Sequence, residues 1–376
     1  MTRLVIIIPS LGLGGAERSL AKLSDVLASN GYEITILCMG SANPEMQCEF
    51  HPAIQVVCLR ARSSASPWML WQVWRHLRRL RPQAVAGWSL YANFAAVITA
   101  RLAGIDRVLV SERNYLPQML GVGGNSSVRR WALSLLVRCL YGRASIVTAN
   151  SKLSLRFLRH FVRGAQHYAV LPNLADIVRY ARLATAPLPQ GLPADAPFPR
   201  LLAVGRLHRQ KGFDLLIQAL ALLPRETTPT LYLAGDGPEE PALRALAARL
   251  GLQAHVHFLG EVTNPFPLYA WADIVVAPSR FEGFPNVPLE AMCTGAAVIV
   301  ADCKSGPREL TEGGRFARLV PVEDVEALAK TMVDLFSDRP TAHALGDQAR
   351  QHVKAHYDRS AVDLVYLAVF ARLCHR

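Results

Sequence analysis

Short apolar runs alternate along this chain with longer segments in which apolar residues recur at helical spacing. The first run predicts a strand from Arg3 to Pro9, and the segment from about Ala16 to Asn30 predicts a helix. A second apolar run from Glu33 to Met39 follows, so the opening unit is βαβ. The pattern therefore predicts an α/β protein built on a parallel sheet.

Polar residues end the later strands of the first half. The run that begins at Val108 ends in Glu112, Arg113 and Asn114, and the run that begins at Ile146 ends in the same manner. Ligands of open α/β sheets bind at the carboxyl ends of the strands, so the first three are candidate site residues. About six strands alternating with helices predict a doubly wound domain over residues 1–180.

The second half repeats this organisation after a proline-rich segment, residues 181–200, which is predicted to be an extended connector. A strand from Leu201 to Gly205, a basic turn and a helix from Phe213 to Leu223 follow it. We therefore predict a second doubly wound domain over residues 201–355 and a final helix over residues 356–376.

The basic turn of the second half holds Arg206, His208, Arg209 and Lys211 ahead of a helix N-terminus. Arginine binds a diphosphate through a planar fork and lysine binds it as a point charge, while the helix N-terminus favours anions. The turn is therefore a candidate diphosphate site. A solvated basic turn without a ligand is the alternative.

Two carboxylates flank a predicted loop and helix between the apolar runs at residues 273–277 and 297–301. Glu282 lies in the loop and Glu290 inside the helix, while Asn286 can cap the helix and Pro288 suits its first turn. Backbone N–H groups at the helix start can hold an anion, and carboxylates accept hydrogen bonds from hydroxyl groups. A sugar joined to a diphosphate would satisfy both.

The glycines at residues 12–15 resemble a dinucleotide-binding fingerprint but do not match it. Glu17 occupies the position of the third glycine, and no acidic residue ends the second strand. A nicotinamide or flavin cofactor is therefore not expected. Gly14 and Gly15 let the backbone approach another ligand, with a tight turn alone as the alternative.

The excess of positive over negative charge lies in the first half of the chain. Of the net charge of +12, residues 1–180 supply the whole excess, with 21 Lys and Arg against 8 Asp and Glu. Such an asymmetry indicates an anionic partner such as a membrane surface, a phosphorylated lipid or a nucleic acid. An Arg-rich surface without a specific partner is the alternative.

A segment over residues 67–82 combines helical periodicity with basic and aromatic side chains, a mixture that residues 129–143 and 152–163 repeat. Basic residues beside interfacial aromatics are typical of a helix on an anionic membrane. Core-facing helices with solvated arginines are the alternative for each segment. The residues predicted to contact the membrane are Trp68, Trp71, Trp74, Arg75, Arg78 and Arg79.

Metal and membrane-spanning signals are weak. No apolar run reaches 18 residues, and the seven cysteines have no metal-ligand spacing and suit reduced cytoplasmic thiols. His255 and His257 alternate onto one strand face without nearby ligands, and no Asp-x-Asp pair occurs. We therefore expect no metal cofactor.

An ordered set of short motifs resembles the retaining family 4 glycosyltransferases of the GT-B fold, over nearly the whole chain. The motifs are Gly14-Gly15, Gly205-Arg-Leu-His-Arg-Gln-Lys-Gly212, Ala234-Gly-Asp-Gly-Pro238, Phe258-Leu-Gly260 and the Glu282-x7-Glu290 stretch. The resemblance implies two facing Rossmann-like domains with a cleft between them. Acceptor binding is expected on the first domain and nucleotide-sugar binding on the second, with the last helix crossing back.

The resemblance also implies residue roles. Arg206 and Lys211 would bind the donor diphosphate and support its departure, and Glu282 would contact the hydroxyls of the transferred sugar. Glu290 would hold the ribose. The resemblance implies that the donor is also bound by Gly283, Phe284, Pro285 and Asn286. Gly14 and Gly15 would close over the donor phosphates.

One departure from the family concerns the first domain. Many members carry a donor-contacting His at the end of the strand where this chain has Ser111-Glu-Arg-Asn114. Either Glu112 or Arg113 replaces it, or another group acts. The first-domain candidates are Glu17, Glu112, Arg113 and Asn114.

The implied activity is a retaining, metal-independent transfer from a nucleotide sugar, with UDP as the expected nucleotide. Ser279-Arg-Phe-Glu-Gly-Phe-Pro-Asn286 with Asp302-Cys-Lys-Ser-Gly-Pro-Arg-Glu309 is further similar to members that extend polyprenyl-diphosphate-linked or capsular glycans, including bacterial N-acetylgalactosamine transferases. This likeness implies an N-acetylhexosamine donor sugar and a polyprenyl-diphosphate-linked saccharide acceptor, at the cytoplasmic face of the cell membrane. A soluble acceptor is one alternative, and a glycoside hydrolase using Glu282 and Glu290 is a remoter one. Nucleic-acid binding is disfavoured because the second half is neutral and no recognition motif occurs.

Overall fold

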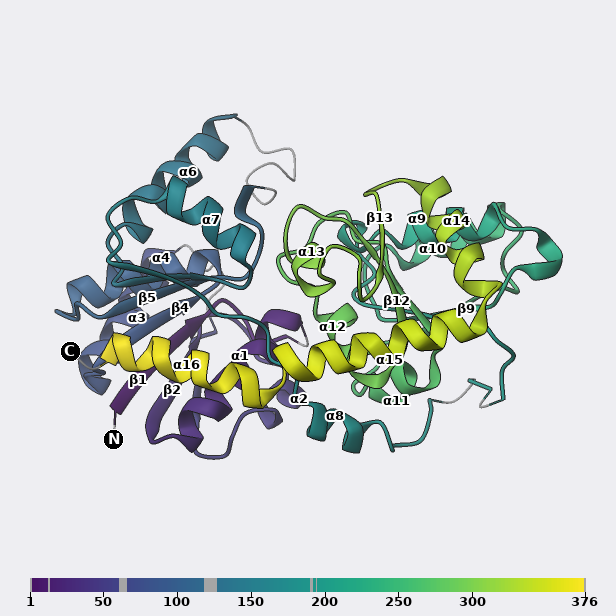
Figure 1. Cartoon of the computed structure of the whole chain (residues 1–376). Coiled ribbons are helices and arrows are strands. Elements are labelled where there is room, and N and C mark those ends of the chain that lie inside the picture. Colours follow the sequence, from purple (N-terminus) through teal and green to yellow (C-terminus); the bar gives the residue numbers. More distant parts are fainter. Residues whose placement is uncertain are drawn as a thin grey trace. The chain divides into compact units, whose positions relative to one another are not determined.

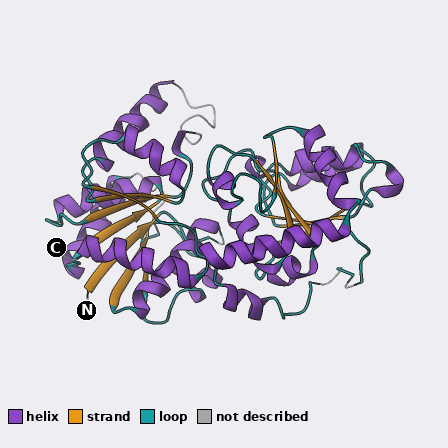
Figure 2. Ribbon diagram, in the orientation of Figure 1, coloured by secondary structure: helices purple, strands orange, loops and turns teal. Residues whose placement is uncertain are grey.

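Two parallel sheets form the cores of two compact units, shown in the computed structural model of Figure 1. The structure describes residues 2–12, 14–60, 66–117, 127–189, 192–193 and 195–374. The first unit comprises residues 1–174 and 360–376, and the second comprises residues 175–359. Figure 2 shows helices flanking the strands within each unit.

The first unit holds a seven-stranded parallel sheet in the order β3-β2-β1-β4-β5-β6-β7. Its strands are β1 (Thr2–Ile8), β2 (Tyr32–Cys38), β3 (Gln55–Cys58), β4 (Ala84–Trp88), β5 (Val108–Glu112), β6 (Ile146–Ala149) and β7 (His167–Val170). Its helices are α1 (Gly15–Ser29), α2 (Pro44–Cys48), α3 (Pro67–Leu80), α4 (Leu90–Leu102), α6 (Ser127–Tyr141), α7 (Lys152–Phe161) and α16 (Arg359–Cys374).

The interior strand β1 is buried on both faces, as its unbroken apolar run from Leu4 to Ile8 predicts. Leu4, Ile6 and Ile8 pack with α1 and α16, while Val5 and Ile7 pack with α3, α4 and α6 on the other face. Alternate side chains of a strand point to opposite faces, so one short segment contributes to both layers of the core.

Helix α16 belongs to the first unit although it follows the second in sequence. Tyr366 and Phe370 are buried in the same cluster as the even-numbered residues of β1. The Tyr366 hydroxyl donates a hydrogen bond to the carbonyl of Pro172, just beyond β7. Figure 1 shows this helix beside β1 and β2.

The second unit holds a six-stranded parallel sheet in the order β10-β9-β8-β11-β12-β13. Its strands are β8 (Leu201–Val204), β9 (Leu231–Ala234), β10 (Val256–Gly260), β11 (Ile274–Ala277), β12 (Ala297–Ala301) and β13 (Arg318–Val320). Its helices are α8 (Ile177–Leu183), α9 (Phe213–Ala221), α10 (Glu240–Arg249), α11 (Phe266–Trp271), α12 (Asn286–Thr294), α13 (Gly306–Leu310), α14 (Val325–Phe336) and α15 (Arg339–His356).

The chain passes from the first unit to the second and back again, and both boundaries lie at other residues than predicted. The first crossing falls after Leu174, and α8 lies in the second unit, so the predicted connector at residues 181–200 begins inside a helix. Asp176 caps α8 by accepting a hydrogen bond from the backbone N–H of Arg179 at 3.0 Å, a helix start that lies before the proline-rich segment. The second crossing falls after Arg359.

No helix within the described ranges combines the length and the apolar composition needed to cross a bilayer.

Candidate active site

The two motifs of the second unit lie on neighbouring strands. The basic turn follows β8, the Glu282 loop follows β11, and these strands pair in parallel, Ile274 with Leu201 and Val275 with Leu202. Carboxyl ends of paired parallel strands meet at one edge of a sheet, where α/β proteins bind ligands. Segments about 70 residues apart are thereby brought together.

Lys211 and Glu282 form an ion pair at the centre of this edge. The Lys211 Nζ lies 2.6 Å from Glu282 Oε1, which also accepts a hydrogen bond from Ser279 Oγ at 2.8 Å. The Lys211 and Glu282 side chains are only 25% and 14% exposed. The carboxylate is thus held in one orientation, with a positive charge beside it.

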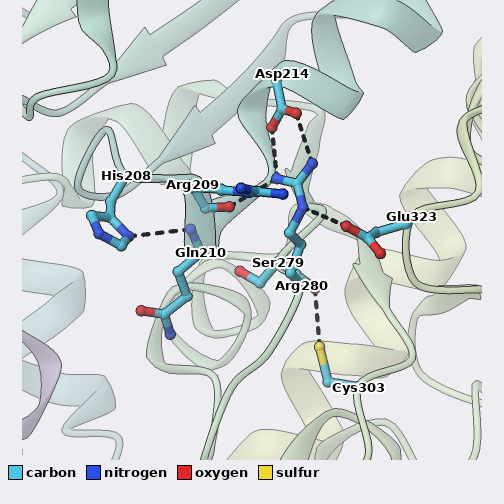
Figure 3. A network of polar contacts seen from close by, with 8 residues as sticks. All are labelled: His208, Arg209, Gln210, Asp214, Ser279, Arg280, Cys303 and Glu323. Carbon is cyan, nitrogen blue, oxygen red and sulfur yellow. Dashed lines mark hydrogen bonds and ion pairs between the residues drawn. The ribbon is translucent and has the colours of Figure 1, made fainter. Parts of the chain in front are cut away.

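Arg280 joins the loop to the basic turn (Figure 3). Its guanidinium donates two hydrogen bonds to Asp214, at 2.8 and 2.7 Å, and a third to Glu323 at 2.6 Å. It also donates to the carbonyl of Arg209 at 2.8 Å. Burial alone would raise the pKa of Asp214, but the hydrogen bonds and charge of Arg280 lower it overall. This bidentate pair fixes the loop and the turn as one body.

Two further contacts hold the turn close to the loop. Gln210 Nε2 donates to the carbonyl of Phe281 at 2.9 Å, and the backbone N–H of Arg280 donates to the carbonyl of Gln210 at 2.8 Å. Gly212 has φ 68°, and a Cβ there would lie 2.2 Å from the carbonyl oxygen of Pro278. Only glycine fits this position, because it tolerates both the left-handed backbone and the close approach.

The other end of the loop is held by the segment before α13. The carbonyl of Gly283 accepts hydrogen bonds from the Gly306 N–H at 2.9 Å and from the Ser305 hydroxyl. The Cys303 thiol donates to the carbonyl of Ser279 at 3.0 Å, and burial is the main cause that raises its pKa to about 12. Cys303 is therefore a structural thiol rather than a nucleophile.

Helix α12 begins differently from the sequence prediction. The N-cap is Pro285, without a side-chain cap hydrogen bond, and Asn286 is the first helical residue, so the prediction that Asn286 caps the helix was wrong. Pro288 lies in the first turn as predicted. A helix start without a side-chain cap is a suitable place for a ligand anion.

Glu290 lies in the second turn of α12 and is 4% exposed. The Tyr269 hydroxyl donates to Glu290 Oε2 at 3.4 Å. Burial, followed by the charge of Glu290, raises the pKa of Tyr180 well above its usual value. The carboxylate is thus buried near two tyrosines, Tyr269 and Tyr180.

Arg206 and Arg209 are the exposed cations of the basic turn, and Arg206 directly follows Gly205. Across the described ranges the Arg206 guanidinium has no protein partner, whereas Lys211 and Arg280 are paired with carboxylates. An exposed, unpaired guanidinium next to a glycine turn is available for an anionic ligand. Gly283, Phe284 and Pro285 are buried in the neighbouring loop.

In the first unit, Glu112 and Arg113 lie in a buried network, 1% and 5% exposed. Glu112 accepts hydrogen bonds from the Tyr141 hydroxyl at 2.9 Å and from the backbone of Arg113 and Asn114 at 3.1 and 3.3 Å. Burial raises the pKa of Glu112 to about 7 and lowers the pKa of Arg113 to about 10.

Arg113 binds other parts of the first unit. It donates to the Leu171 carbonyl at 3.0 Å, to Ser19 Oγ at 2.8 Å and to Asn173 Oδ1, and it lies 4.5 Å above the Trp88 ring. With these partners, Arg113 positions the segment after β7. This geometry does not favour direct substrate contact by Glu112 or Arg113.

The opening glycines stand at the start of α1. Gly14 is exposed and is the N-cap of α1, and Gly15 is its first residue. Glu17 lies in the first turn, so close that a Cβ on Gly14 would be 2.5 Å from its Oε2. Asn114 and Glu17 are partly exposed, unlike Glu112 and Arg113.

Helix α3 carries the predicted aromatic residues. Trp68 and Trp71 are 60% and 42% exposed and stack with ring centroids 4.6 Å apart. Arg75 lies 5.5 Å from the Trp71 ring centroid, and Arg78 and Arg79 are exposed. Trp74 is partly buried and donates to the Leu102 carbonyl at 3.3 Å, so it anchors α3 to α4.

Two family models match the chain in succession. The model described as Glycosyltransferase Family 4 matches residues 13–179, and the model described as Glycosyl transferases group 1 matches residues 198–338. Together they span most of the chain and correspond to the two units. The chain therefore belongs to these glycosyltransferases, as its motifs suggest.

The chain is similar to bacterial glycosyltransferases over almost its whole length. It is 29% identical over 370 residues to N-acetylgalactosamine-N,N'-diacetylbacillosaminyl-diphospho-undecaprenol 4-alpha-N-acetylgalactosaminyltransferase of Campylobacter jejuni, covering 94% of this chain and 96% of that protein. It is 26% identical over 360 residues to the lipopolysaccharide core biosynthesis glycosyltransferase LpsD of Rhizobium meliloti, covering 96% and 95%.

Solved structures share the fold. Anabaena HepE in complex with UDP and glucose superposes with a TM-score of 0.83 at 21% identity, covering 99% of this chain and 100% of that chain. WaaG, a glycosyltransferase involved in lipopolysaccharide biosynthesis, superposes with a TM-score of 0.75 at 16% identity, covering 99% and 100%. The predicted GT-B fold class is therefore confirmed.

Proposed function

We propose that the protein is a retaining glycosyltransferase that moves a sugar from a UDP-linked donor to a lipid-linked saccharide. The observation that carries the proposal is the Lys211–Glu282 pair, held at the carboxyl ends of β8 and β11, with the exposed Arg206 in the same turn as Lys211. These groups suit a sugar diphosphate, because cations bind its phosphates and a carboxylate binds its hydroxyls.

The relatives support the choice of donor and acceptor. The Campylobacter jejuni transferase is named for a diphospho-undecaprenol-linked saccharide and an N-acetylgalactosaminyl group, and Anabaena HepE was solved with UDP-glucose. By analogy, we assign to this chain a UDP-linked N-acetylhexosamine as donor and a polyprenyl-diphosphate saccharide as acceptor.

The proposed reaction takes place at C1 of the donor sugar. The bond from C1 to the β-phosphate oxygen breaks, and its electron pair leaves with UDP. The acceptor hydroxyl oxygen forms the new bond to C1 on the same face, and its proton passes to the departing phosphate. Arg206, Lys211 and the start of α12 stabilise the negative charge that develops on the diphosphate.

Glu282 would accept hydrogen bonds from the hydroxyls of the transferred sugar. Glu290 would accept hydrogen bonds from the hydroxyls of the ribose. Because Lys211 and Ser279 already hold Glu282, it is positioned before the donor arrives. The proposed reaction uses no protein nucleophile and no metal ion.

We further propose that the protein works in the cytoplasm at the inner membrane face. The exposed tryptophans of α3 and its neighbouring arginines provide the apolar and basic groups that an anionic lipid surface attracts. A lipid-linked acceptor would be reached from such a position.

The test is transfer by the purified full chain from UDP- and GDP-sugars to a synthetic polyprenyl-diphosphate saccharide, with and without EDTA. We expect transfer from a UDP-sugar with retained anomeric configuration by NMR, unaffected by EDTA. Absence of product with every pair would overturn the proposal, and an inverted product would overturn its retaining part. Equal rates with an acceptor lacking the lipid would favour a soluble acceptor.

A matched pair of lysine variants tests the site assignment. Lys211→Ala should lower kcat by about 100-fold or more, because one donor to a developing charge contributes about that much. Lys330→Ala removes the same charge from the exposed face of α14 and should leave kcat unchanged. Equal activity of the two variants would contradict the role of Lys211.

A further inference from the structure

The second unit holds another cluster of chemically active side chains, none of which belongs to the Lys211–Glu282 pair. Glu312, just after α13, meets His352 and His356 of α15, and one ligand atom from each residue lies within 4.8 Å of the other two. The two histidines are four residues apart, so they share one face of the helix.

A hydrogen bond sets the orientation of the buried histidine. His352 Nε2 faces the Leu310 carbonyl oxygen at 3.0 Å, so this nitrogen carries the proton and donates. The lone pair of the neutral ring is then on Nδ1, the atom 3.6 Å from Glu312 Oε1. Metal-binding histidines are usually fixed in this way, with the second nitrogen donating to a carbonyl.

Stacking fixes the same ring from its face. The Phe316 ring lies parallel to His352, with centroids 4.1 Å apart and an interplanar angle of 12°. Both the rotation and the tautomer of His352 are therefore determined by its neighbours. The side chain is 3% exposed, so its Nδ1 is directed toward the other two residues from a rigid base.

The carboxylate is oriented from its outer side. Arg315 lies 3.7 Å from Glu312 Oε2, which leaves Oε1 directed toward the histidine. Carboxylates that bind metals are commonly paired in this manner through the oxygen that does not coordinate. Glu312 also has φ 46°, a left-handed backbone that a glutamate rarely adopts.

An open hollow of about 350 Å³ borders the cluster, with room for an ion and its bound water. Its lining residues are Glu312, Arg315, Phe316, Gln348, Gln351, His352 and His356.

We propose that Glu312, His352 and His356 bind a divalent transition-metal ion, with zinc as the ion that the ligand set suits best. Two imidazole nitrogens and one carboxylate oxygen supply three positions of a tetrahedron, and water fills the fourth. The ion would tie the last turn of α15 to the segment after α13. No step of sugar transfer is assigned to the ion, because these residues are not among the groups assigned to that reaction.

Zinc titration of the full chain tests the proposal. The protein is freed of metal with a chelator, and its affinity for zinc is measured by competition with a chromophoric chelator. We expect one zinc equivalent for the unaltered protein and at least about tenfold weaker binding for His356→Gln, because even the loss of an outer partner of a metal ligand costs that much. His356 is exposed, so this variant should fold.

His343→Gln is the matched control, since His343 is half-exposed on the same helix but outside the cluster. Zinc should raise the melting temperature of the unaltered protein and of His343→Gln by more than that of His356→Gln or Glu312→Gln, because weaker binding gives less stabilisation. Magnesium should raise none of them, because it disfavours imidazole ligands. Equal zinc affinity of His356→Gln and His343→Gln, or no bound equivalent in the unaltered protein, would overturn the site.

Discussion

At the scale of single residues, Glu112 has the clearest consequence for stability. It is buried, and its pKa is raised to about 7 from a usual value of 4.5. Below about pH 4.5 the carboxyl is protonated in both the folded and the unfolded chain. Between pH 4.5 and 7 the unfolded chain loses the proton first, so the free energy of unfolding falls as pH rises, and the full cost remains above pH 7.

We expect Glu112→Gln to remove this dependence. The stability of the variant relative to the unaltered protein should increase between pH 4 and pH 8 by roughly 3 kcal/mol, which is the pKa shift expressed as free energy. Urea denaturation at both pH values measures it. Glu33→Gln, at an exposed position of β2, serves as control, and the same pH response in both variants would contradict the prediction.

Sequence reasoning selected the residues that carry recognisable chemistry. Lys211 and Glu282 stand in motifs with a clear physical purpose, and the structure brings them together at 2.6 Å. Arg280 and Asp214, which hold the loop against the turn, were missed. Their pairing joins positions 66 residues apart, and an arginine beside a glutamate in a loop gives no sign of such a partner.

At the scale of elements, helix α3 offers a test of membrane contact. We expect Trp68→Ala/Trp71→Ala to weaken binding to vesicles of anionic phospholipid by at least tenfold, because each exposed ring is worth on the order of 1–2 kcal/mol when buried. Co-sedimentation at two salt concentrations measures this. Replacing Arg75, Arg78 and Arg79 by Gln should reduce the salt dependence, since each charge contributes about 1 kcal/mol near the surface.

Leu222→Ala is the control for this experiment, because Leu222 is 56% exposed in the second unit. It should bind the vesicles like the unaltered protein. If the tryptophan variant also binds equally well, α3 is an ordinary surface helix.

The elements that sequence reasoning did not locate lack a periodic signal. Strand β4 is short and contains two alanines and a glycine, so it gives a weak apolar signal. Gly87 is needed there because a Cβ would lie 2.6 Å from the Asn93 Cα. Helix α4 is largely buried and apolar around its circumference, so no polar face marks its period. The strands flanking the Glu282 loop were predictable, since β11 and β12 are unbroken apolar runs.

At the scale of the whole molecule, α16 makes the stability of the first unit depend on residues beyond the second. Phe370 is fully buried against β1, so Phe370→Ala should destabilise that unit by about 3–5 kcal/mol. Hydrogen exchange should show lost protection in β1 and β2, with β8 and β11 unaffected. Leu364→Ala, on the exposed face of the same helix, should change neither, and equal loss of protection in both units would contradict the prediction.

The two crossings between the units also set an order of events during synthesis. The second unit is one continuous segment, residues 175–359, inserted within the first. At a translation rate of 5–20 residues per second, the ribosome needs roughly 10 to 40 s to make that segment. Throughout this interval the nascent first unit lacks α16, so the face of β1 that carries Leu4, Ile6 and Ile8 is covered by α1 but not by α16. The second unit can close as soon as its own chain emerges, so the unit that begins first is the one that is completed last.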